Sequence, residues 1–134
     1  MKIAAVTDDG QVISAHFGRA TKYAVLTVEN GRIVNSEIRA KIGHREFQSE
    51  GHDHDHHHDH RGRGFGHHSE EKHRRMFETI TDCEVVLARG MGRGAYNDMQ
   101  QMGIRPILTD IVDVETAVWE VVNDSIVDHS ERLH

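Results

Sequence analysis

Three groups of residues in this sequence have types and a spacing that could do chemistry. The first is the glycine turn, residues 90–95 (Gly-Met-Gly-Arg-Gly-Ala), which follows an apolar run and leads into a helical pattern. At such a turn the first backbone N–H groups of the helix lack partners, and the helix dipole adds positive charge behind them. Glycines let a ligand approach that backbone closely. The pattern predicts an anion-binding turn with these candidate residues: Gly90, Gly92, Arg93 and Gly94.

The second group is the segment Ser14-Ala15-His16-Phe17-Gly18-Arg19, which has no clean helical or strand period and is interpreted as a structured loop. A neutral imidazole such as that of His16 is a good ligand for iron or zinc. The same imidazole could instead hydrogen-bond a backbone carbonyl and only shape the loop. His16 is therefore a candidate metal ligand with a structural alternative.

The third group is a histidine tract at residues 52–60, in which six of nine residues are histidine and three are aspartate. Both types bind divalent transition metals when they are deprotonated. The tract predicts a site that gathers nickel, zinc, cobalt or iron; the alternative is a solvated loop that binds such metals only incidentally. The spacing specifies no single coordination geometry. The candidate ligands are His52, His54, His56, His57, His58, His60, His67 and His68.

Two other interpretations of the glycine turn stay open. Gly90-x-Gly92-x-x-Ala95 fits a dinucleotide-binding pattern, and Asp110 stands about twenty residues further on. The context is poor, however, because only one strand is expected after the turn. The turn could also be a tight strand-to-helix connection that binds nothing.

Composition excludes several classes of protein. The chain has 134 residues, which suits one domain, and its formal net charge of −6 argues against a nucleic-acid binder. The one cysteine, Cys83, excludes an internal disulfide and favours a reducing, cytoplasmic setting; we expect it to be a buried small side chain. No apolar run approaches membrane-spanning length. A nuclease using Asp8 would need further clustered carboxylates, so we expect no enzyme.

Periodicity predicts the elements that position these groups. The expected order is β-β-β-α-β-α-β-α, with an antiparallel start and parallel strands at the end, which gives an α/β fold with a mixed sheet. Asn30-Gly31 predicts a hairpin turn, and Pro106 favours an edge or strand-start position. The expected strands cover residues 3–6, 23–29, 32–39, 85–88 and 104–109, and the expected helices follow Ser69, the glycine turn and Asp113.

The same signals set the helix ends and the domain boundaries. Asp113 is an expected N-cap and Gly103 an expected C-terminal cap. The inner faces are predicted to carry His73, Met76, Phe77 and Ile80 in the first helix, Ala95, Met99 and Met102 in the second, and Val114, Ala117, Val118 and Val121 in the last. We expect one domain over residues 1–124, a flexible His-rich insert at 43–68, and a polar, frayed tail at 125–134.

Several motifs together resemble one known family. The motifs are the strand Lys2–Val6, the segment Val12–Ala20 with its His-Phe-Gly core, the strand start Asp82–Val86, the turn Gly90–Tyr96, and Gly103-Ile104. Over about residues 1–122 they resemble the dinitrogenase iron–molybdenum cofactor biosynthesis family, of the nitrogenase accessory-factor type. The His-Phe-Gly motif and the glycine turn carry this resemblance jointly.

The resemblance implies a ribonuclease H-like three-layer α/β/α fold with a sheet of about five strands. It implies a protein that binds, carries or inserts an iron–sulfur or iron–molybdenum type cluster, with a cluster-assembly or recipient metalloprotein as partner and no catalysis. The implied cluster-binding residues are His16, Phe17, Gly18 and Arg19 together with the glycine turn. The histidine tract lies outside the family pattern, so the metal stays open. The alternatives are a divalent-metal buffer or sensor and, less favoured, a nucleotide-binding module.

Overall fold

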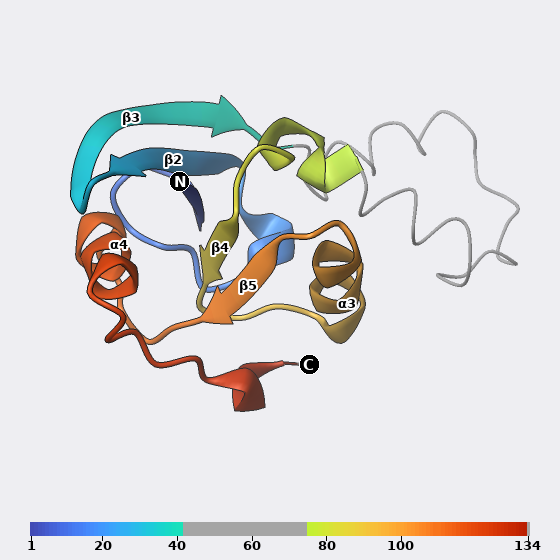
Figure 1. The fold of residues 1–134 in the computed structure, drawn as a ribbon. Coiled ribbons are helices and arrows are strands. Elements are labelled where there is room, and N and C mark those ends of the chain that lie inside the picture. Colours follow the sequence, from blue (N-terminus) through green and yellow to red (C-terminus); the bar gives the residue numbers. More distant parts are fainter. Residues whose placement is uncertain (42–74, 134) are drawn as a thin grey trace, which may run out of the picture.

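A five-stranded sheet in the order β3-β2-β1-β4-β5 forms the centre of the computed structural model, which describes residues 1–41 and 75–133 (Figure 1). β1–β2 and β2–β3 pair antiparallel, whereas β1–β4 and β4–β5 pair parallel. The predicted mixed sheet of an α/β protein is therefore confirmed. The elements are β1 (Lys2–Thr7), η1 (Phe17–Arg19), β2 (Lys22–Glu29), β3 (Arg32–Ala40), η3 (Glu78–Ile80), β4 (Val85–Ala88), α3 (Arg93–Gln101), β5 (Arg105–Leu108), α4 (Val114–Val122) and η4 (Ser130–Arg132).

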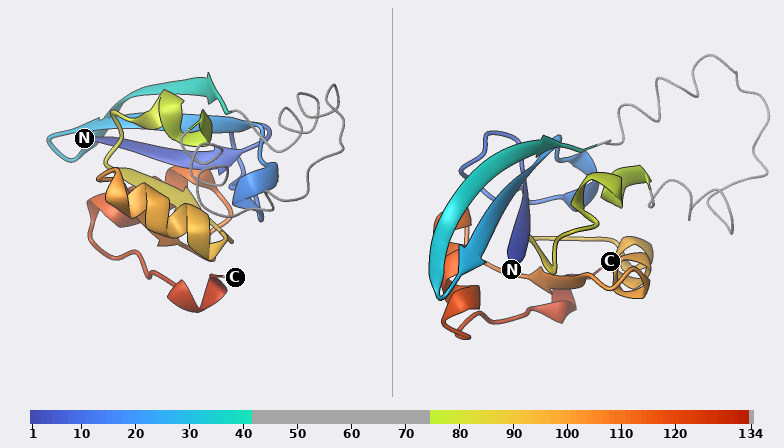
Figure 2. Two further views of the ribbon diagram at one scale, coloured as in Figure 1. Left: turned by 90° about the vertical axis from the view of Figure 1, so that its right-hand side faces the viewer. Right: turned by 45° about the horizontal axis from the view of Figure 1, so that its top comes forward.

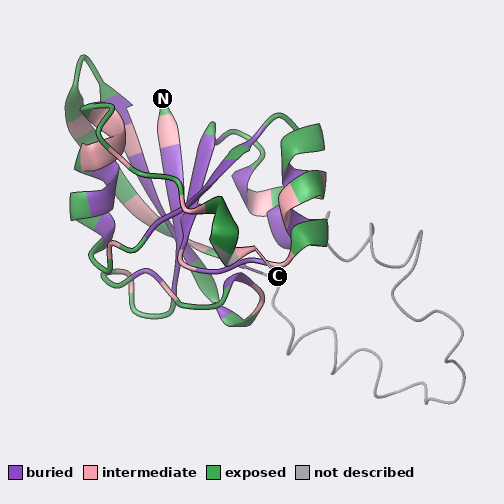
Figure 3. Ribbon diagram, turned by 90° about the horizontal axis from the view of Figure 1, so that it is seen from below, coloured by how far each residue is buried: buried purple, intermediate pink, exposed green. Residues whose placement is uncertain are grey.

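The sheet lies between helices on both sides, as Figure 3 shows from below, with α4 on one face and α3 on the other. Residues 3–7 of β1 and all of β4 are buried, which matches their continuous apolar runs. β2 is buried on both faces, with Ala24, Leu26 and Val28 on one and Tyr23 and Val25 on the other. β5 is an edge strand, so Pro106 removes no ladder hydrogen bond that an outer neighbour would need.

Local turn and cap signals act as the sequence predicts. Asn30 and Gly31 have φ values of 53° and 75°, the left-handed pair that a two-residue hairpin turn requires. Figure 2 shows the β2–β3 hairpin curving along the sheet, and the pairing register shifts between Thr27 and Val28, as it does at a β-bulge. The Asp113 carboxylate accepts hydrogen bonds from the Thr116 hydroxyl at 2.7 Å and the Thr116 N–H at 2.9 Å, and these bonds lower its pKa.

One residue that was predicted to face inward is exposed, and some predicted helix residues lie outside the described ranges. Met102 is 38% exposed rather than inward-facing, because α3 ends at Gln101 and Met102 is its C-cap. Gly103 follows with φ +85°, as its role of cap requires. Met76, Phe77 and Ile80 are buried on one face, as predicted. Ser69, His73 and the insert at 43–68 lie outside the described residues.

The expectation that the C-terminal tail frays is wrong. The backbone N–H of His129 donates to the Leu108 carbonyl, and the Asp128 carboxylate accepts from the Leu108 N–H. Leu133 bridges to Met91 and packs against the core. β5 is an edge strand with unpaired backbone groups, and the tail satisfies two of them, the N–H and the carbonyl of Leu108.

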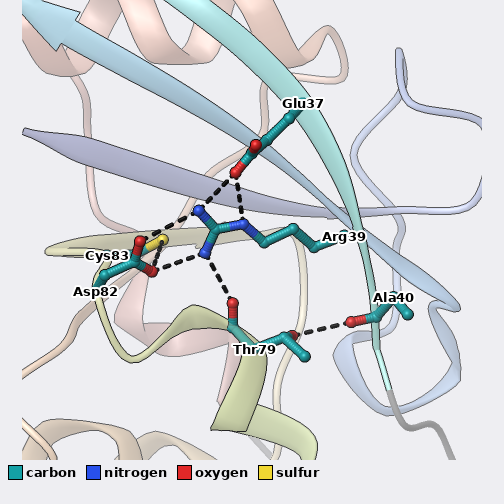
Figure 4. Close-up of polar contacts among 6 residues, drawn as sticks. All are labelled: Glu37, Arg39, Ala40, Thr79, Asp82 and Cys83. Atoms are coloured by element: carbon teal, nitrogen blue, oxygen red, sulfur yellow. Dashed lines mark hydrogen bonds and ion pairs between the residues drawn. The ribbon is translucent and has the colours of Figure 1, made fainter.

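A polar clasp joins the two chain segments from which the insert departs (Figure 4). The guanidinium of Arg39 donates to both carboxylate oxygens of Asp82, at 2.7 and 3.1 Å, and to the Thr79 carbonyl at 2.8 Å. The Thr79 hydroxyl in turn donates to the Ala40 carbonyl at 2.9 Å. Glu37 adds a 2.7 Å contact to the Arg39 Nε. The base of the insert is thus closed by residues outside it.

Replacing residues 43–68 with a short Gly/Ser linker should leave thermal unfolding cooperative. The clasp already holds the ends together, and shortening a flexible loop changes its closure free energy by only about 1 kcal/mol or less. Circular dichroism melting of both proteins checks this. Loss of the cooperative transition in the linker variant would mean that the tract packs against the core.

Asp82→Asn should destabilise the protein at neutral pH by about 1 kcal/mol, a modest value because the carboxylate is half exposed. The Arg39 hydrogen bonds lower the pKa of Asp82. This stabilisation is therefore present above the unfolded-state pKa of about 3.9 and is lost as pH falls through the folded value. Urea unfolding at neutral pH and near pH 3 should show the difference between the two proteins shrinking; a constant difference would contradict the clasp. Glu29→Gln, on an exposed carboxylate outside the clasp, is the control.

Candidate functional site

The carboxyl ends of the parallel strands β1 and β4 meet at one edge of the sheet, and two of the predicted segments come together there. The Phe17 N–H, in the loop that follows β1, donates to the Gly90 carbonyl, just beyond β4, at 3.1 Å. Asp8 lies at the same edge, where its carboxylate accepts from the Thr21 N–H and hydroxyl. This matches the location expected for ligands in open α/β sheets.

The Phe17 side chain anchors the loop in the core. Its ring is 3% exposed and packs against Phe77 and Tyr23, with ring centroids 5.8 and 6.4 Å apart. The Tyr23 hydroxyl donates to the Met76 carbonyl at 2.6 Å, and burial raises the pKa of that phenol. Phe17 therefore serves this edge through packing and its backbone N–H, since its ring lies in the core.

His16 is exposed at the start of η1. Its carbonyl accepts from the Arg19 and Ala20 N–H groups at 3.2 Å, which fixes the backbone of the loop. The imidazole has no hydrogen-bond or ion-pair partner among residues 1–41 and 75–133. The alternative in which this ring hydrogen-bonds a backbone carbonyl is therefore not seen in the described part of the chain.

The N-terminus of α3 presents free donors at the same edge. Gly92 is the N-cap and has no side chain to cap the helix, and the first backbone hydrogen bond of the turn runs from the Tyr96 N–H to the Gly92 carbonyl at 3.1 Å. Within the described residues, the N–H groups of Arg93, Gly94 and Ala95 meet no acceptor. Three donors and the helix dipole therefore favour an anion here.

Two glycines leave open space beside these groups. A Cβ at Gly18 or Gly92 would meet nothing within 4 Å, and neither residue has a positive φ. The fold itself does not require glycine at either position. A bulky ligand could occupy the space that a side chain would take, directly beside His16 and the helix N-terminus.

Three arginines belong to the segments that form this edge, although the whole chain is acidic. The guanidinium groups of Arg19, Arg89 and Arg93 have no ion-pair partner among the residues that the structure describes. The nearby carboxylate of Asp8 is engaged by Thr21. Local charge, rather than net charge, therefore favours an anionic ligand.

Lys41 is a buried cation that sequence reasoning missed. It is 4% exposed, its Nζ donates to the Ala20 carbonyl at 3.2 Å, and it lies 4.6 Å from the centroid of the Phe17 ring. Burial lowers its pKa to about 8, with the Asp8 charge acting in the opposite direction. A lysine at the end of a strand is normally solvated, so no local signal marks it.

Other candidate ligands are buried, paired with another side chain or outside the described residues. Cys83 is buried before β4, at the opposite end of that strand from Gly90, and burial raises its pKa to about 11. Asp110, the candidate ribose partner, lies 3.2 Å from the His129 Nε2. Among the described residues no three His, Cys, Asp or Glu side chains group to hold a metal. The candidate tract ligands His52, His54, His56, His57, His58, His60, His67 and His68 lie outside the described residues.

Fold and edge together define a small α/β domain with a cationic, donor-rich rim. A family model described as dinitrogenase iron–molybdenum cofactor matches residues 1–124, and the chain belongs to that family. This confirms the resemblance seen in the His-Phe-Gly and glycine-turn motifs. No curated protein sequence matches the chain. No helix in the described ranges is long and apolar enough to cross a membrane.

Solved structures share the fold at low sequence identity. A candidate dinitrogenase from Methanocaldococcus jannaschii matches with a TM-score of 0.63 and 10% identity, over 97% of this chain and 95% of that one. The apo form of the orange protein from Desulfovibrio gigas matches at 0.62 and 16%, over 96% and 92%. A candidate NifB protein from Thermotoga matches at 0.58 and 17%, over 95% and 91%. At these identities the likeness concerns the fold.

Proposed function

We propose that this protein binds and carries an anionic metal–sulfur cluster of the iron–sulfur or iron–molybdenum type at the edge formed by residues 16–19 and 90–94. The observation that carries the proposal is the 3.1 Å bond from the Phe17 N–H to the Gly90 carbonyl, because it joins the loop of the exposed His16 to the uncapped start of α3. Sulfides of such clusters accept hydrogen bonds from backbone N–H groups, and their negative charge suits this rim.

The few ligands and hydrogen-bond donors at this edge favour a protein that carries a cluster over one that holds it permanently or uses it in catalysis. One imidazole and a few N–H groups give a cluster fewer bonds than the four thiolates of a typical iron–sulfur site. The single cysteine of the chain is buried at the other end of β4 and protonated at neutral pH. A cytoplasmic carrier that receives its cargo from a cluster-assembly protein, and releases it to a recipient metalloprotein, needs such limited ligation.

Two further assignments belong to this proposal. The family implies a ribonuclease H-like fold, and the antiparallel β1–β2–β3 unit continued by the parallel strands β4 and β5 supports that assignment. The histidine tract at 52–60 is proposed to gather divalent metal ions, since imidazole and carboxylate groups suit nickel, zinc or cobalt. If the tract acts alone, the protein is a divalent-metal buffer or sensor.

His16→Ala should lower retention of a preformed iron–sulfur or iron–molybdenum cluster at least about tenfold, the size of effect seen when even an outer-shell partner of a metal ligand is removed. Arg93→Glu should act in the same direction because it inverts a charge at the helix N-terminus. The measurement is anaerobic loading of the full chain followed by gel filtration and visible absorbance. Arg105→Glu, an exposed arginine at the start of β5, is the matched control.

The same variants separate the carrier from the metal buffer. His16→Ala should leave nickel or zinc binding almost unchanged, whereas replacing the tract histidines should abolish it and spare cluster retention. Nickel binding should also weaken as pH falls through about 6.5, where imidazole becomes protonated. Equal cluster retention by wild type and His16→Ala, or none by either, would contradict the carrier and favour the buffer.

A further inference from the structure

Lys41 connects the end of β3 to the loop that carries His16. Its backbone N–H donates to the Thr21 carbonyl at 3.1 Å, which fixes the residue at the start of β2. Its Nζ donates to the Ala20 carbonyl at 3.2 Å, and Ala20 is the C-cap of η1. One side chain therefore bonds the end of the turn that His16 begins.

The aromatic contact of Lys41 involves the residue that joins the loop to the glycine turn. The Nζ lies 4.6 Å from the centroid of the Phe17 ring, within cation–π range, and the Phe17 N–H bonds Gly90. Lysine groups near the carboxyl end of a helical turn hydrogen-bond its last carbonyls favourably. A continuous set of contacts thus runs from Lys41 through η1 to the start of α3.

We propose that Lys41 is a positioning residue for the cluster edge: its buried amine holds η1, and with it His16, against the glycine turn. This inference rests on the proposed function only for the identity of the ligand. The positioning itself concerns contacts within the folded chain. Lys22 offers a contrast, because it is exposed and its Nζ bonds the Asp8 carbonyl rather than η1.

The protonation state of Lys41 should set how firmly η1 is held. An ammonium makes a stronger hydrogen bond and cation–π contact than a neutral amine. Because burial lowers its pKa to about 8, the loop should loosen as pH rises through that value. Asp8 is the charged group that acts on this amine, and the neighbouring Tyr23 hydroxyl is engaged by the Met76 carbonyl.

Nuclear magnetic resonance of the cluster-free full chain tests the positioning directly. In wild type, the amide signals of Gly18, Arg19 and Ala20 should shift between about pH 6 and about pH 10 with the same midpoint as the Lys41 side chain. Lys41→Met should lack this transition, and Lys41→Arg should keep the low-pH signals throughout. Lys22→Met is the matched control and should titrate like wild type. If the Lys41 side chain titrates in wild type and these amide signals do not follow it, the proposal is overturned even if Lys41→Met does not fold.

Cluster retention provides the second measurement, with the same preformed iron–sulfur cluster as probe. Retention by wild type should fall about fivefold as pH rises through the Lys41 transition, and Lys41→Met should show the weaker value at every pH. Lys41→Arg should stay near the wild-type value at low pH. Equal retention by wild type and Lys41→Met would overturn the positioning role. If wild type retains no cluster at any pH, the proposed function fails, and the amide titration still decides the role of Lys41.

Discussion

The buried ring of Phe17 is the anchor on which the geometry of the candidate edge depends. Burying a phenylalanine side chain contributes about 1.5–3 kcal/mol, whereas one backbone hydrogen bond contributes about 0.5–1.5 kcal/mol net. The ring packed on Tyr23 and Phe77 therefore contributes more to holding residues 16–19 in place than the single bond to Gly90 does. The bond to Gly90 sets where the loop sits relative to α3. The ring of Phe17 thus packs the loop against the core, and its backbone N–H sets the position of the loop relative to the glycine turn.

Under the proposed function, two kinds of metal chemistry belong to two parts of the chain. The folded edge offers N–H groups and cations, which favour an anionic cluster. The histidine tract offers imidazoles and carboxylates, which favour a bare divalent cation. The clasp of Arg39, Thr79 and Asp82 closes the domain between them, because it bonds the segments on either side of the insert. An insertion at this place leaves the sheet and its edge intact.

Local signals in the sequence predicted what depends on local physics, namely the Asn30-Gly31 turn, the Asp113 cap and the two buried strands. They also marked His16 and the glycine turn as candidate site residues, and the structure brings the two together because both follow strands whose ends meet at one edge. The Arg39–Asp82 contact spans 43 residues, and no pattern in the sequence around either residue predicts it. Lys41 was missed for a similar reason, since its side chain contacts Ala20 and Phe17, which are more than twenty residues away in the sequence. The docking of the tail on β5 was also not predicted, because β5 becomes an edge strand only in the folded sheet.

Amide spectra of the full chain, recorded with and without a bound paramagnetic iron–sulfur cluster, test the central claim most directly. An unpaired-electron centre broadens the signals nearest to it, so the spectrum locates the cargo without any mutation. If the cluster binds as proposed, the signals of residues 16–19 and 92–95 should disappear first, while those of β3 and α4 should persist. Broadening confined to the histidine tract, with the signals of residues 16–19 and 92–95 unchanged, would contradict the account.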